Sequence, residues 1–275
     1  MFKNKLMDVS IIIINFNTIT LTRNCIASVH KFTADINFEI ILVDNASTET
    51  DISVLQNEFP SIKLVQSPLN LGFAGGNNLG IQYASGKYIL LLNSDTYLKD
   101  NAIFGIFKYM ETHPEAGAVS ARLIFPDGKL QAVAQRFPSI KYQLIELFRL
   151  QKLMSAKKAG RLLLGAFFDH RETVKADWIW GACFMFPKSI LSQLHANKLE
   201  DTYFMYCEDV QWCMDFNRLG YEIHFFAGAE IVHLMGGSSG KKNEMMLQNG
   251  NLFLKKNYPV WQIKWIKQLE NWLKP

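Results

Sequence analysis

Short apolar runs alternate with longer mixed segments along the first half of the chain. The runs are rich in β-branched and aliphatic residues, too short for helices, and span residues 9–14, 39–43, 62–66, 88–92 and 118–123. Such runs are typical of strands buried on both faces of a sheet. Helices are predicted between them, at residues 20–32, 51–59 and 101–112, and from the glycine-rich turn 70–78 through residue 84. This alternation predicts an α/β fold with a mostly parallel central sheet and helices on both faces.

Polar side chains follow three of these strands at the point where each one ends. The endings are Asn15-Phe16-Asn17, Asp44-Asn45 and Asn93-Ser94-Asp95. The carboxyl ends of parallel strands meet at one edge of the sheet, where α/β proteins bind their ligands. A single polar ending is typical of an ordinary turn. Three endings on one edge, beside the glycine-rich segment "NLGFAGGNN", favour a ligand site.

The second half has a different pattern. Residues 136–175 mix aliphatic side chains with nine bases and three acids. A helix is predicted at 209–219, with Gly220 as its stop, and a strand at 221–225. No internal repeat or low-complexity tract interrupts the chain.

Composition narrows the class of protein. The 275 residues are 49% hydrophobic and 20% charged, an ordinary globular mixture. The 29 basic and 25 acidic side chains leave a net charge of only +4, which argues against a nucleic-acid partner. No apolar run reaches the roughly 18 residues of a membrane span. The four cysteines lack C-x-x-C spacing. We therefore expect a cytoplasmic protein, one that can still sit on the inner face of the cell membrane.

The polar endings suggest specific chemistry. Asp95, with Asn93 two residues before it, suits a hard divalent cation such as Mg²⁺ or Mn²⁺. His233 follows a strand-like run and is a candidate second ligand, although a lone histidine is more often structural. Glu208 and Asp209 open a predicted helix. They are either acids stabilised by the helix dipole or a general base at the mouth of a pocket.

Two common nucleotide motifs are missing. "NLGFAGGN" does not match G-x-G-x-x-G, and it follows the third strand instead of the first, so a dinucleotide-binding dehydrogenase is disfavoured. The chain also contains no G-x-x-x-x-G-K-[ST] segment, which excludes a P-loop.

The ordered set of motifs resembles a family 2 glycosyltransferase of the GT-A fold. Each motif is weak alone, and together they are specific: "VSIIIINFN", "IILVDNAST", "NLGFAGGNN", "LLLNSDT", "GAVSARLIFPDGKLQ", "WIWGACFMFPKSI" and "YCEDVQWCMDFNRLGY". The "FPDGKLQ…RFPS" stretch and the "GFAGGNN" variant further resemble bacterial rhamnosyltransferases of surface-polysaccharide assembly. The resemblance implies a catalytic domain at 1–240, with nucleotide-sugar binding in about 1–125 and acceptor binding in about 126–240, followed by a helical tail at 241–275.

The resemblance also implies roles for individual residues. Asp209 corresponds to the catalytic base of the "ED" motif, and Asp95 and His233 to metal ligands. Residues near the donor or acceptor are Phe16 and Asp44 at the nucleobase, Asn93 and Ser94 beside the metal, and Trp180 and Glu208 near the sugars. Further donor-binding candidates lie in the first polar ending and the glycine-rich segment: Asn17, Asn70, Gly72, Gly76 and Asn77. The sequence departs from the family pattern at Asn93, where the first acid of D-x-D is usual, at Ile14 in place of a proline, and at Gly76 in place of an arginine.

These roles lead to an expected reaction. A nucleoside-diphosphate sugar, dTDP- or UDP-linked, binds at the strand ends with Mg²⁺ or Mn²⁺. Asp209 then deprotonates a hydroxyl of a saccharide or lipid-linked saccharide acceptor, and the sugar, expected to be rhamnose, is transferred with inversion. Two alternatives remain open: a nucleotide-sugar binding module with a decayed site, and a nucleotidyltransferase on a similar sheet.

The tail carries a helical pattern of its own, with Pro259 suited to a first helical position. At about 100° per residue, one face collects Trp261, Trp265, Ile266, Leu269, Trp272 and Leu273. The other face collects mainly Lys264, Lys267, Glu270, Asn271 and Lys274. Such a helix either packs on the domain or lies in a membrane interface. The second interpretation predicts salt-sensitive, peripheral membrane contact.

Overall fold

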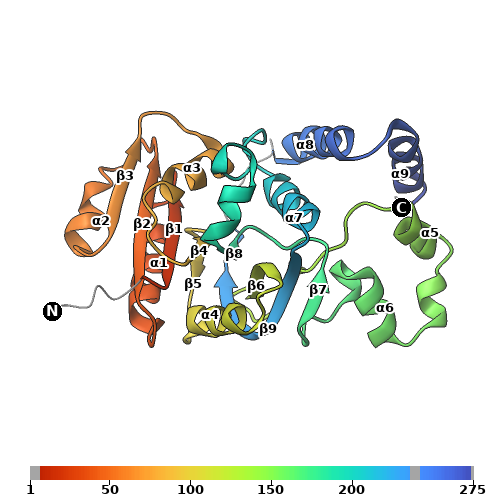
Figure 1. Cartoon of the computed structure of the whole chain (residues 1–275), viewed down its shortest axis with the longest axis horizontal. Helices are drawn as coiled ribbons and strands as arrows, with labels where there is room; N and C mark the ends of the chain where they lie inside the picture. Colours follow the sequence, from red (N-terminus) through yellow and green to blue (C-terminus); the bar gives the residue numbers. More distant parts are fainter. Residues whose placement is uncertain (1–6, 236–241, 274–275) are drawn as a thin grey trace.

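A computed structural model describes residues 7–235 and 242–273 of the chain. Within these ranges the strands form one sheet in the order β3-β2-β1-β4-β8-β6-β9-β5, and β7 pairs with β9 (Figure 1). The strands are β1 Val9–Asn15, β2 Phe38–Asn45, β3 Lys63–Ser67, β4 Tyr88–Leu92, β5 Thr96–Tyr97, β6 Ala116–Ile124, β7 Val174–Ala176, β8 Cys183–Pro187 and β9 Glu222–His233.

Helices connect and extend this sheet. They are α1 Ile19–Phe32, α2 Ser53–Glu58, α3 Gly72–Ile81, α4 Ala102–Thr112, α5 Ile140–Leu147, α6 Ala156–Leu163, α7 Glu208–Arg218, α8 Lys242–Asn257 and α9 Val260–Leu273. Short 3-10 helices lie at η1 Leu150–Leu153, η2 Gly165–Phe167, η3 Lys188–Gln193 and η4 His195–Asn197. The helix α2 and the strand β3 lie at one end of the molecule, and α5, α6 and α9 lie at the other end (Figure 1). The rest of the sheet lies between these two ends.

The mostly parallel sheet predicted from the sequence is confirmed. β1 pairs in parallel with β2 and β4, β2 pairs in parallel with β3, and β6 pairs in parallel with β9. β8 runs antiparallel to both β4 and β6, so β9 points in the same direction as β4. The carboxyl ends of β1, β2, β4 and β9 therefore meet at one edge, as the polar endings predicted.

Helices cover both faces of the sheet. On one face, a Cβ added at Gly80 of α3 would lie 2.6 Å from Ile12 Cγ2 and 3.0 Å from Val43 Cγ2. Because side chains alternate along a strand, Ile11 and Ile13 point to the opposite face. Both are fully buried, so that face is covered as well. The strands are buried on both sides because their residues are almost all apolar.

Some predicted boundaries are wrong. The glycine-rich segment was expected to be a turn, but most of it is the first two turns of α3, which ends at Ile81 instead of residue 84. Close packing against β1 and β2 outweighs the low helix propensity of glycine here. The strand predicted at 221–225 continues through His233. β8 was not assigned, and this strand, from the second half, inserts into the middle of the same sheet. The described part of the predicted helical tail 241–275 contains two helices, α8 and α9.

The tail folds back onto α7. Asn257 of α8 donates from Nδ2 to Gln211 Oε1 at 2.8 Å and accepts from Arg218 Nη2 at 2.8 Å. In α9, the six apolar residues predicted to share a face do not share an environment. Ile266 and Leu269 are buried, whereas Trp261, Trp265 and Trp272 are exposed. At about 100° per residue the six cover an arc of about 140°, which is wider than the face that contacts a neighbouring helix. Lys274 lies outside the described residues.

Among residues 7–235 and 242–273, no helix is both long enough and apolar enough to cross a membrane.

Candidate active site

The polar endings of β1 and β2 form a connected network at the sheet edge. Asn15 and Asp44 are paired in the register of the two strands, and Asn15 Nδ2 donates to Asp44 Oδ1 at 3.0 Å. Thr22 Oγ1 donates to Asn15 Oδ1 at 2.7 Å, which fixes the orientation of the amide. Asp44 also accepts from the backbone N–H of Ser47 at 3.3 Å. An ionised carboxylate has about four acceptor sites, so Asp44 keeps acceptor capacity for a ligand.

The loop after β1 joins this network to the end of β4. Asn17 has a positive φ of 54°, and its Oδ1 accepts from the backbone N–H of Thr48 at 2.8 Å. Thr18 Oγ1 lies 3.2 Å from Ser94 Oγ. Phe16 projects from this loop with 42% of its surface exposed. An exposed aromatic ring and a carboxylate acceptor at the ends of two paired strands suit a nucleobase, which stacks through its face and donates through its edge.

The ends of β4 and β9 bring Asp95 and His233 together. His233 Nε2 lies 3.3 Å from Asp95 Oδ1, and the backbone N–H of Leu234 donates to the carbonyl of Asp95 at 2.9 Å. These contacts join residues that lie far apart in the sequence. The structure thus places the two predicted metal ligands side by side.

A buried glutamine orients this histidine. Gln131 Nε2 donates to the carbonyl of His233 at 2.7 Å, which directs Gln131 Oε1 to His233 Nδ1 at 2.8 Å. Because a carbonyl oxygen only accepts, Nδ1 must carry a proton. In neutral His233, therefore, the lone pair of Nε2 points toward the Asp95 carboxylate. Outer hydrogen bonds of this kind fix ligating histidines in metal sites.

The surroundings of Asp95 fit a divalent cation. Two ligand atoms at right angles on an ion with bonds of about 2.1 Å would lie about 3 Å apart, close to the 3.3 Å between Asp95 Oδ1 and His233 Nε2. In the part of the chain that the structure describes, Asn93 Oδ1 is buried and has no hydrogen-bond partner. Buried oxygens are normally satisfied. A cation with bound water, or a ligand donor, would give Asn93 Oδ1 the partner that it lacks among the described residues.

Asp209 lies in the first turn of α7, presented by a strained segment. Tyr206 and Cys207, directly before the helix, have positive φ values of 69° and 71°. This is a conformation that non-glycine residues adopt at a cost and that occurs often at functional sites. The backbone N–H of Gly181 donates to Asp209 Oδ2 at 3.0 Å, and the next residue, Ala182, accepts from Asn93 N–H at 3.0 Å. Two hydrogen bonds across the Gly181-Ala182 segment thus join Asp209 to the Asn93–Asp95 loop.

Burial raises the pKa values of both acids in this helix turn. Burial raises the pKa of Asp209 to about 6, against the opposing effect of the Gly181 N–H. Burial, followed by the charge of Asp209, raises the pKa of Glu208 well above its ordinary value. Among the described residues, Glu208 Oε2 has no hydrogen-bond partner. A base with a pKa near neutrality, beside a carboxyl group whose ionised form is disfavoured by burial, is an arrangement suited to proton transfer.

The glycine-rich segment makes close contacts with the rest of the protein. Asn70 Oδ1 accepts from the backbone N–H of Gly72 at 2.9 Å and from Asn45 Nδ2 at 3.0 Å. Gly72 has φ +71°, and a Cβ there would lie 2.1 Å from the carbonyl oxygen of Phe204.

The next two predicted residues of the segment face the protein interior. A Cβ at Gly76 would lie 3.0 Å from Ile14 Cδ1. Asn77 is buried, and its Nδ2 donates to Phe73 O within the same helix. The donor-binding roles that the resemblance implies for these residues stay predictions.

This segment also reaches the candidate base. A Cβ on Gly181 would lie 3.1 Å from Phe73 Cε1 and 3.4 Å from Asp209 Cβ. Gly181 therefore sits between α3 and α7. Trp180, directly before it, is half-buried and packs against the core.

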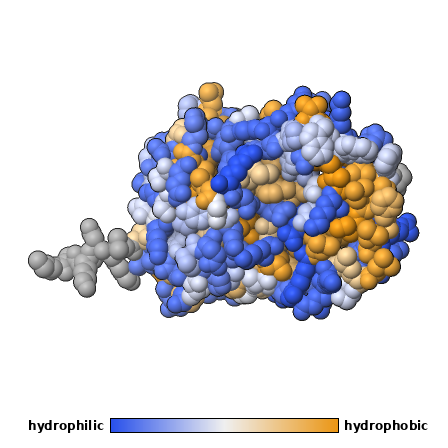
Figure 2. Space-filling model, turned by 45° about the vertical axis from the view of Figure 1, so that its right-hand side comes forward, coloured by the Kyte–Doolittle hydropathy of each residue, from blue (hydrophilic) through white to orange (hydrophobic). Residues whose placement is uncertain are grey.

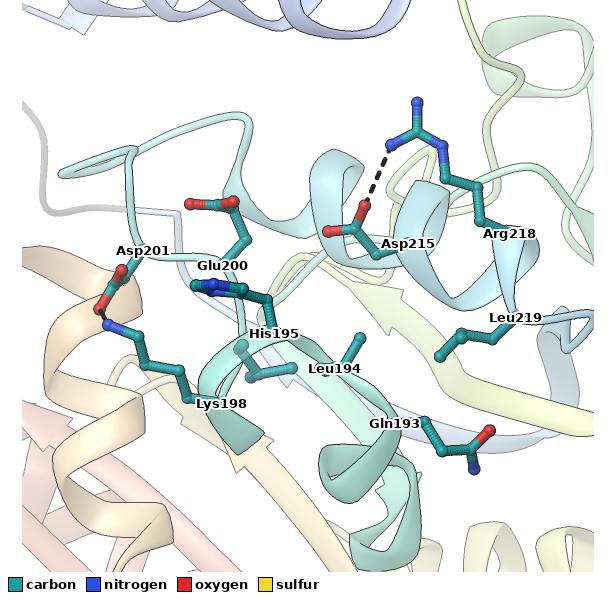
Figure 3. A pocket seen from close by; sticks show the side chains of 10 residues that line it. Gln193, Leu194, His195, Lys198, Glu200, Asp201, Asp215, Arg218 and Leu219 are labelled. Carbon is teal, nitrogen blue, oxygen red and sulfur yellow. Dashed lines mark hydrogen bonds and ion pairs between the residues drawn. The ribbon is translucent and has the colours of Figure 1, made fainter.

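A cavity of about 550 Å³ lies apart from these residues (Figure 3). It takes Asp215 and Arg218 from the later turns of α7 and shares no residue with the polar endings. Its charged side chains are paired: Arg218 with Asp215 at 3.3 Å, Lys198 with Asp201 at 2.6 Å, and Glu200 with Lys256, which lies outside the lining. Paired charges satisfy one another, so this cavity has no strong recognition element for a charged ligand.

A second group of potential ligands lies at the opposite end of β9. One ligand atom each of Glu115, Glu222 and His224 falls within 4.8 Å of the others. Lys175 Nζ already pairs with Glu222 Oε1 at 2.6 Å, which supplies a positive charge without a metal. This group is separate from the Asp95 edge.

Two functional contacts were missed by sequence reasoning. Gln131 belongs to the "GKLQ" stretch, but its contact with His233 bridges 102 residues, and no local pattern indicates it. Gly181 contributes only a backbone N–H to Asp209, and every residue type except proline carries that group.

Comparison with known proteins gives a consistent result. Residues 10–193 match the family described as Glycosyl transferase family 2. An N-acetylglucosaminyl-diphospho-decaprenol L-rhamnosyltransferase of Mycobacterium tuberculosis is 21% identical over 226 residues, which cover 74% of this chain and 68% of that protein. The rhamnosyltransferase WbbL of Escherichia coli is 24% identical over 207 residues, covering 72% and 74%. A poly(ribitol-phosphate) beta-glucosyltransferase of Bacillus spizizenii is 26% identical over 211 residues, covering 62% and 33%.

Proposed function

Because the chain belongs to glycosyltransferase family 2, a family with the GT-A fold, we propose that it transfers rhamnose with inversion from a dTDP- or UDP-linked donor. The acceptor in this proposal is a lipid-linked saccharide of cell-surface polysaccharide biosynthesis. Two similar proteins carry the name rhamnosyltransferase, and one of those names specifies a diphospho-decaprenol carrier. These names support the proposal for the sugar and the acceptor class.

The observation that carries the proposal is the meeting of three chemistries at one sheet edge. Asp44 offers acceptor capacity, and the exposed ring of Phe16 directly follows Asn15, which bonds to Asp44. Asp95 and His233 form a ligand pair, and Asp209 is joined to their loop through Gly181-Ala182. The first feature suits the nucleobase of the donor, the second suits its diphosphate, and the third suits the reacting hydroxyl of the acceptor.

The protein side chains would hold the donor by complementary contacts. The nucleobase stacks on Phe16 and donates to Asp44. Asp95 and His233 would hold the Mg²⁺ or Mn²⁺ ion, and Asn93 Oδ1 would accept a hydrogen bond from water bound to that ion or from the donor. The imidazole ligand favours the softer Mn²⁺. When bound, the ion offsets the negative charge that develops on the departing diphosphate.

Asp209 would carry the proton transfer. The acceptor hydroxyl gives its proton to an Asp209 carboxylate oxygen while the hydroxyl oxygen bonds to the anomeric carbon. The bond between that carbon and the diphosphate oxygen breaks on the opposite side, and the nucleoside diphosphate departs with the electron pair. A pKa of about 6 leaves Asp209 mostly ionised at neutral pH, yet basic enough to accept the proton.

The state of Glu208 supports inversion. A retaining reaction through a covalent intermediate needs a second, ionised carboxylate as nucleophile. Glu208 is the carboxyl group nearest in sequence to Asp209, and burial raises its pKa well above the ordinary value, which disfavours the ionised form that a nucleophile needs. One base without a nucleophile leads to a single displacement, which inverts the anomeric carbon.

The test is transfer itself. Purified protein with Mn²⁺ is given dTDP-rhamnose, or members of a UDP-sugar panel, and a diphospholipid-linked N-acetylglucosamine acceptor. We expect a disaccharide product with inverted anomeric configuration by NMR, together with free nucleoside diphosphate. Binding without turnover would favour a binding module. Pyrophosphate release would favour a nucleotidyltransferase, and a retained configuration would remove the single-displacement mechanism.

A further inference from the structure

Three short elements at one end of the molecule expose a large amount of apolar surface (Figure 2). We call the surface of α5, η1 and α9 the apolar end face. Its exposed apolar residues are Leu144, Phe148, Leu150, Leu153, Val260, Trp261, Trp265 and Trp272. Leu153 is 84% exposed, and each of the three tryptophans is more than half exposed. Exposed apolar side chains gathered on neighbouring elements in this way are typical of an interaction site.

The apolar end face has a fixed scaffold. Ile266 and Leu269 of α9 are buried, and α9 packs beside α5, where Gln143 Nε2 donates to Glu270 Oε1 at 3.4 Å. The buried pair lies at one edge of the apolar arc of α9, and the tryptophans lie at the other. The same helix therefore packs on the domain and presents its tryptophans outward, so the two interpretations of its sequence are compatible.

Positive charge accompanies this apolar surface. Residues 140–158 contain five basic side chains and one acid, Glu146. Arg149 and Lys152 are exposed within or beside η1, and Lys264 is exposed on α9, one residue before Trp265. Lysine and arginine beside exposed aromatic and aliphatic groups match the two layers of an anionic membrane surface, the headgroups and the upper acyl chains.

We propose that the apolar end face docks the protein onto an anionic lipid bilayer, with α5, η1 and α9 lying in the interface. Tryptophan favours this depth because its ring is apolar and its N–H is polar. The docking proposal depends only on the exposed apolar side chains and the basic side chains of the apolar end face. Its consequence, that the acceptor reaches the Asp209 edge from the same membrane, rests on the proposed function.

The experiment is co-sedimentation of the full chain with vesicles. We expect binding to vesicles of phosphatidylcholine with phosphatidylglycerol, weak binding to phosphatidylcholine alone, and release at high salt. Replacing Trp261, Trp265 and Trp272 together by Ser should weaken binding at least about tenfold. Neutralising Arg149, Lys152 and Lys264 to Gln should weaken it by about fivefold per charge, on the order of a hundredfold in all.

Matched controls separate docking from general effects. Leu69→Ser with Tyr83→Ser removes exposed apolar groups elsewhere, and Lys31→Gln with Lys108→Gln removes distant charges. These variants should bind vesicles like the unaltered chain. Unchanged melting temperature and nucleoside-diphosphate binding would show that the fold and the strand edge are intact.

Three outcomes would overturn the docking proposal. The unaltered chain could stay in the supernatant at low salt. The tryptophan and charge variants could bind as well as the controls. Sedimentation velocity could also show a dimer that the tryptophan variant abolishes, in which case a second copy covers the face. None of these bears on transfer, which a soluble acceptor analogue tests separately.

Discussion

Replacing Asp209 by Asn tests the proposed base with little change in shape. The Asn carbonyl oxygen can still accept from the Gly181 N–H, which lies 3.0 Å from Asp209 Oδ2. The proton-accepting carboxylate is lost. A positioned base contributes about 10²–10⁴ in rate, so kcat should fall by about two to four orders of magnitude. Donor binding should survive because Asp44, Asp95 and His233 are untouched.

The pH dependence sharpens this prediction. Burial raises the pKa of Asp209 to about 6, so at pH 7 roughly ten molecules in eleven carry the ionised base, and at pH 5 roughly one in eleven. The proton-accepting form is the ionised one, so kcat/KM should fall as pH drops through about 6. Without burial the same limb would lie near pH 4. Asp209→Asn should lack this limb.

Stability should move in the opposite direction from activity. A carboxyl group with a raised folded-state pKa binds its proton more tightly in the folded protein, so its ionisation destabilises the fold as pH rises from about 4 to 6. At pH 7 the melting temperature of Asp209→Asn should equal or exceed that of the unaltered chain. Near-normal turnover in this variant would refute the assignment of the base.

A control on the same helix completes the test. Asp215 accepts from Gln211 Nε2 at 2.8 Å and lines the separate cavity. Asp215→Asn should keep turnover within a few-fold. An equal loss in both variants would indicate that damage to α7, not loss of a base, lowers the rate.

Two further predictions concern residues that position the site. Gln131→Leu removes both hydrogen bonds to His233 and should weaken Mn²⁺ binding about 10–100-fold in calorimetry; unchanged Mn²⁺ affinity would contradict the orienting role. Gly72→Ala places a Cβ 2.1 Å from the Phe204 carbonyl oxygen at φ +71° and should lower the free energy of unfolding by about 2–4 kcal/mol in urea titrations. Gly250→Ala, with nothing within 4 Å in α8, should instead raise it by about 0.5–1 kcal/mol; equal effects at the two glycines would contradict the packing argument.

The convergence of the strand ends could be predicted because it follows from a general rule. Once the apolar runs are taken as parallel strands, their carboxyl ends must share an edge, and Asn15, Asp44 and Asn93 do. The pairing of Asp95 with His233 was only a candidate from the residues, because a lone histidine is more often structural, and the family resemblance favoured it. The structure adds the 3.3 Å separation that makes the pair usable.

The remaining features depend on tertiary contacts that no local pattern contains. Gly72 and Gly76 suggested a turn because glycine is a weak helix former, yet packing against Phe204 and Ile14 makes small residues necessary in a helix there. Gln131 meets His233 only because β6 and β9 are neighbours. The helix α9 divides its apolar residues between the α5 contact and solvent, and its periodicity alone does not show where that division falls.

The most direct test of the strand-edge site is calorimetric titration with UDP, dTDP, ADP and GDP, with and without Mn²⁺, in the unaltered chain and in Asp95→Ala. This measurement does not depend on the identity of the sugar or the acceptor. We predict that UDP or dTDP binds, that Mn²⁺ strengthens the binding, and that Asp95→Ala loses the Mn²⁺ effect while its fold is retained. Absence of binding by both pyrimidine nucleotides, or a Mn²⁺ effect that is unchanged in Asp95→Ala, would contradict the account.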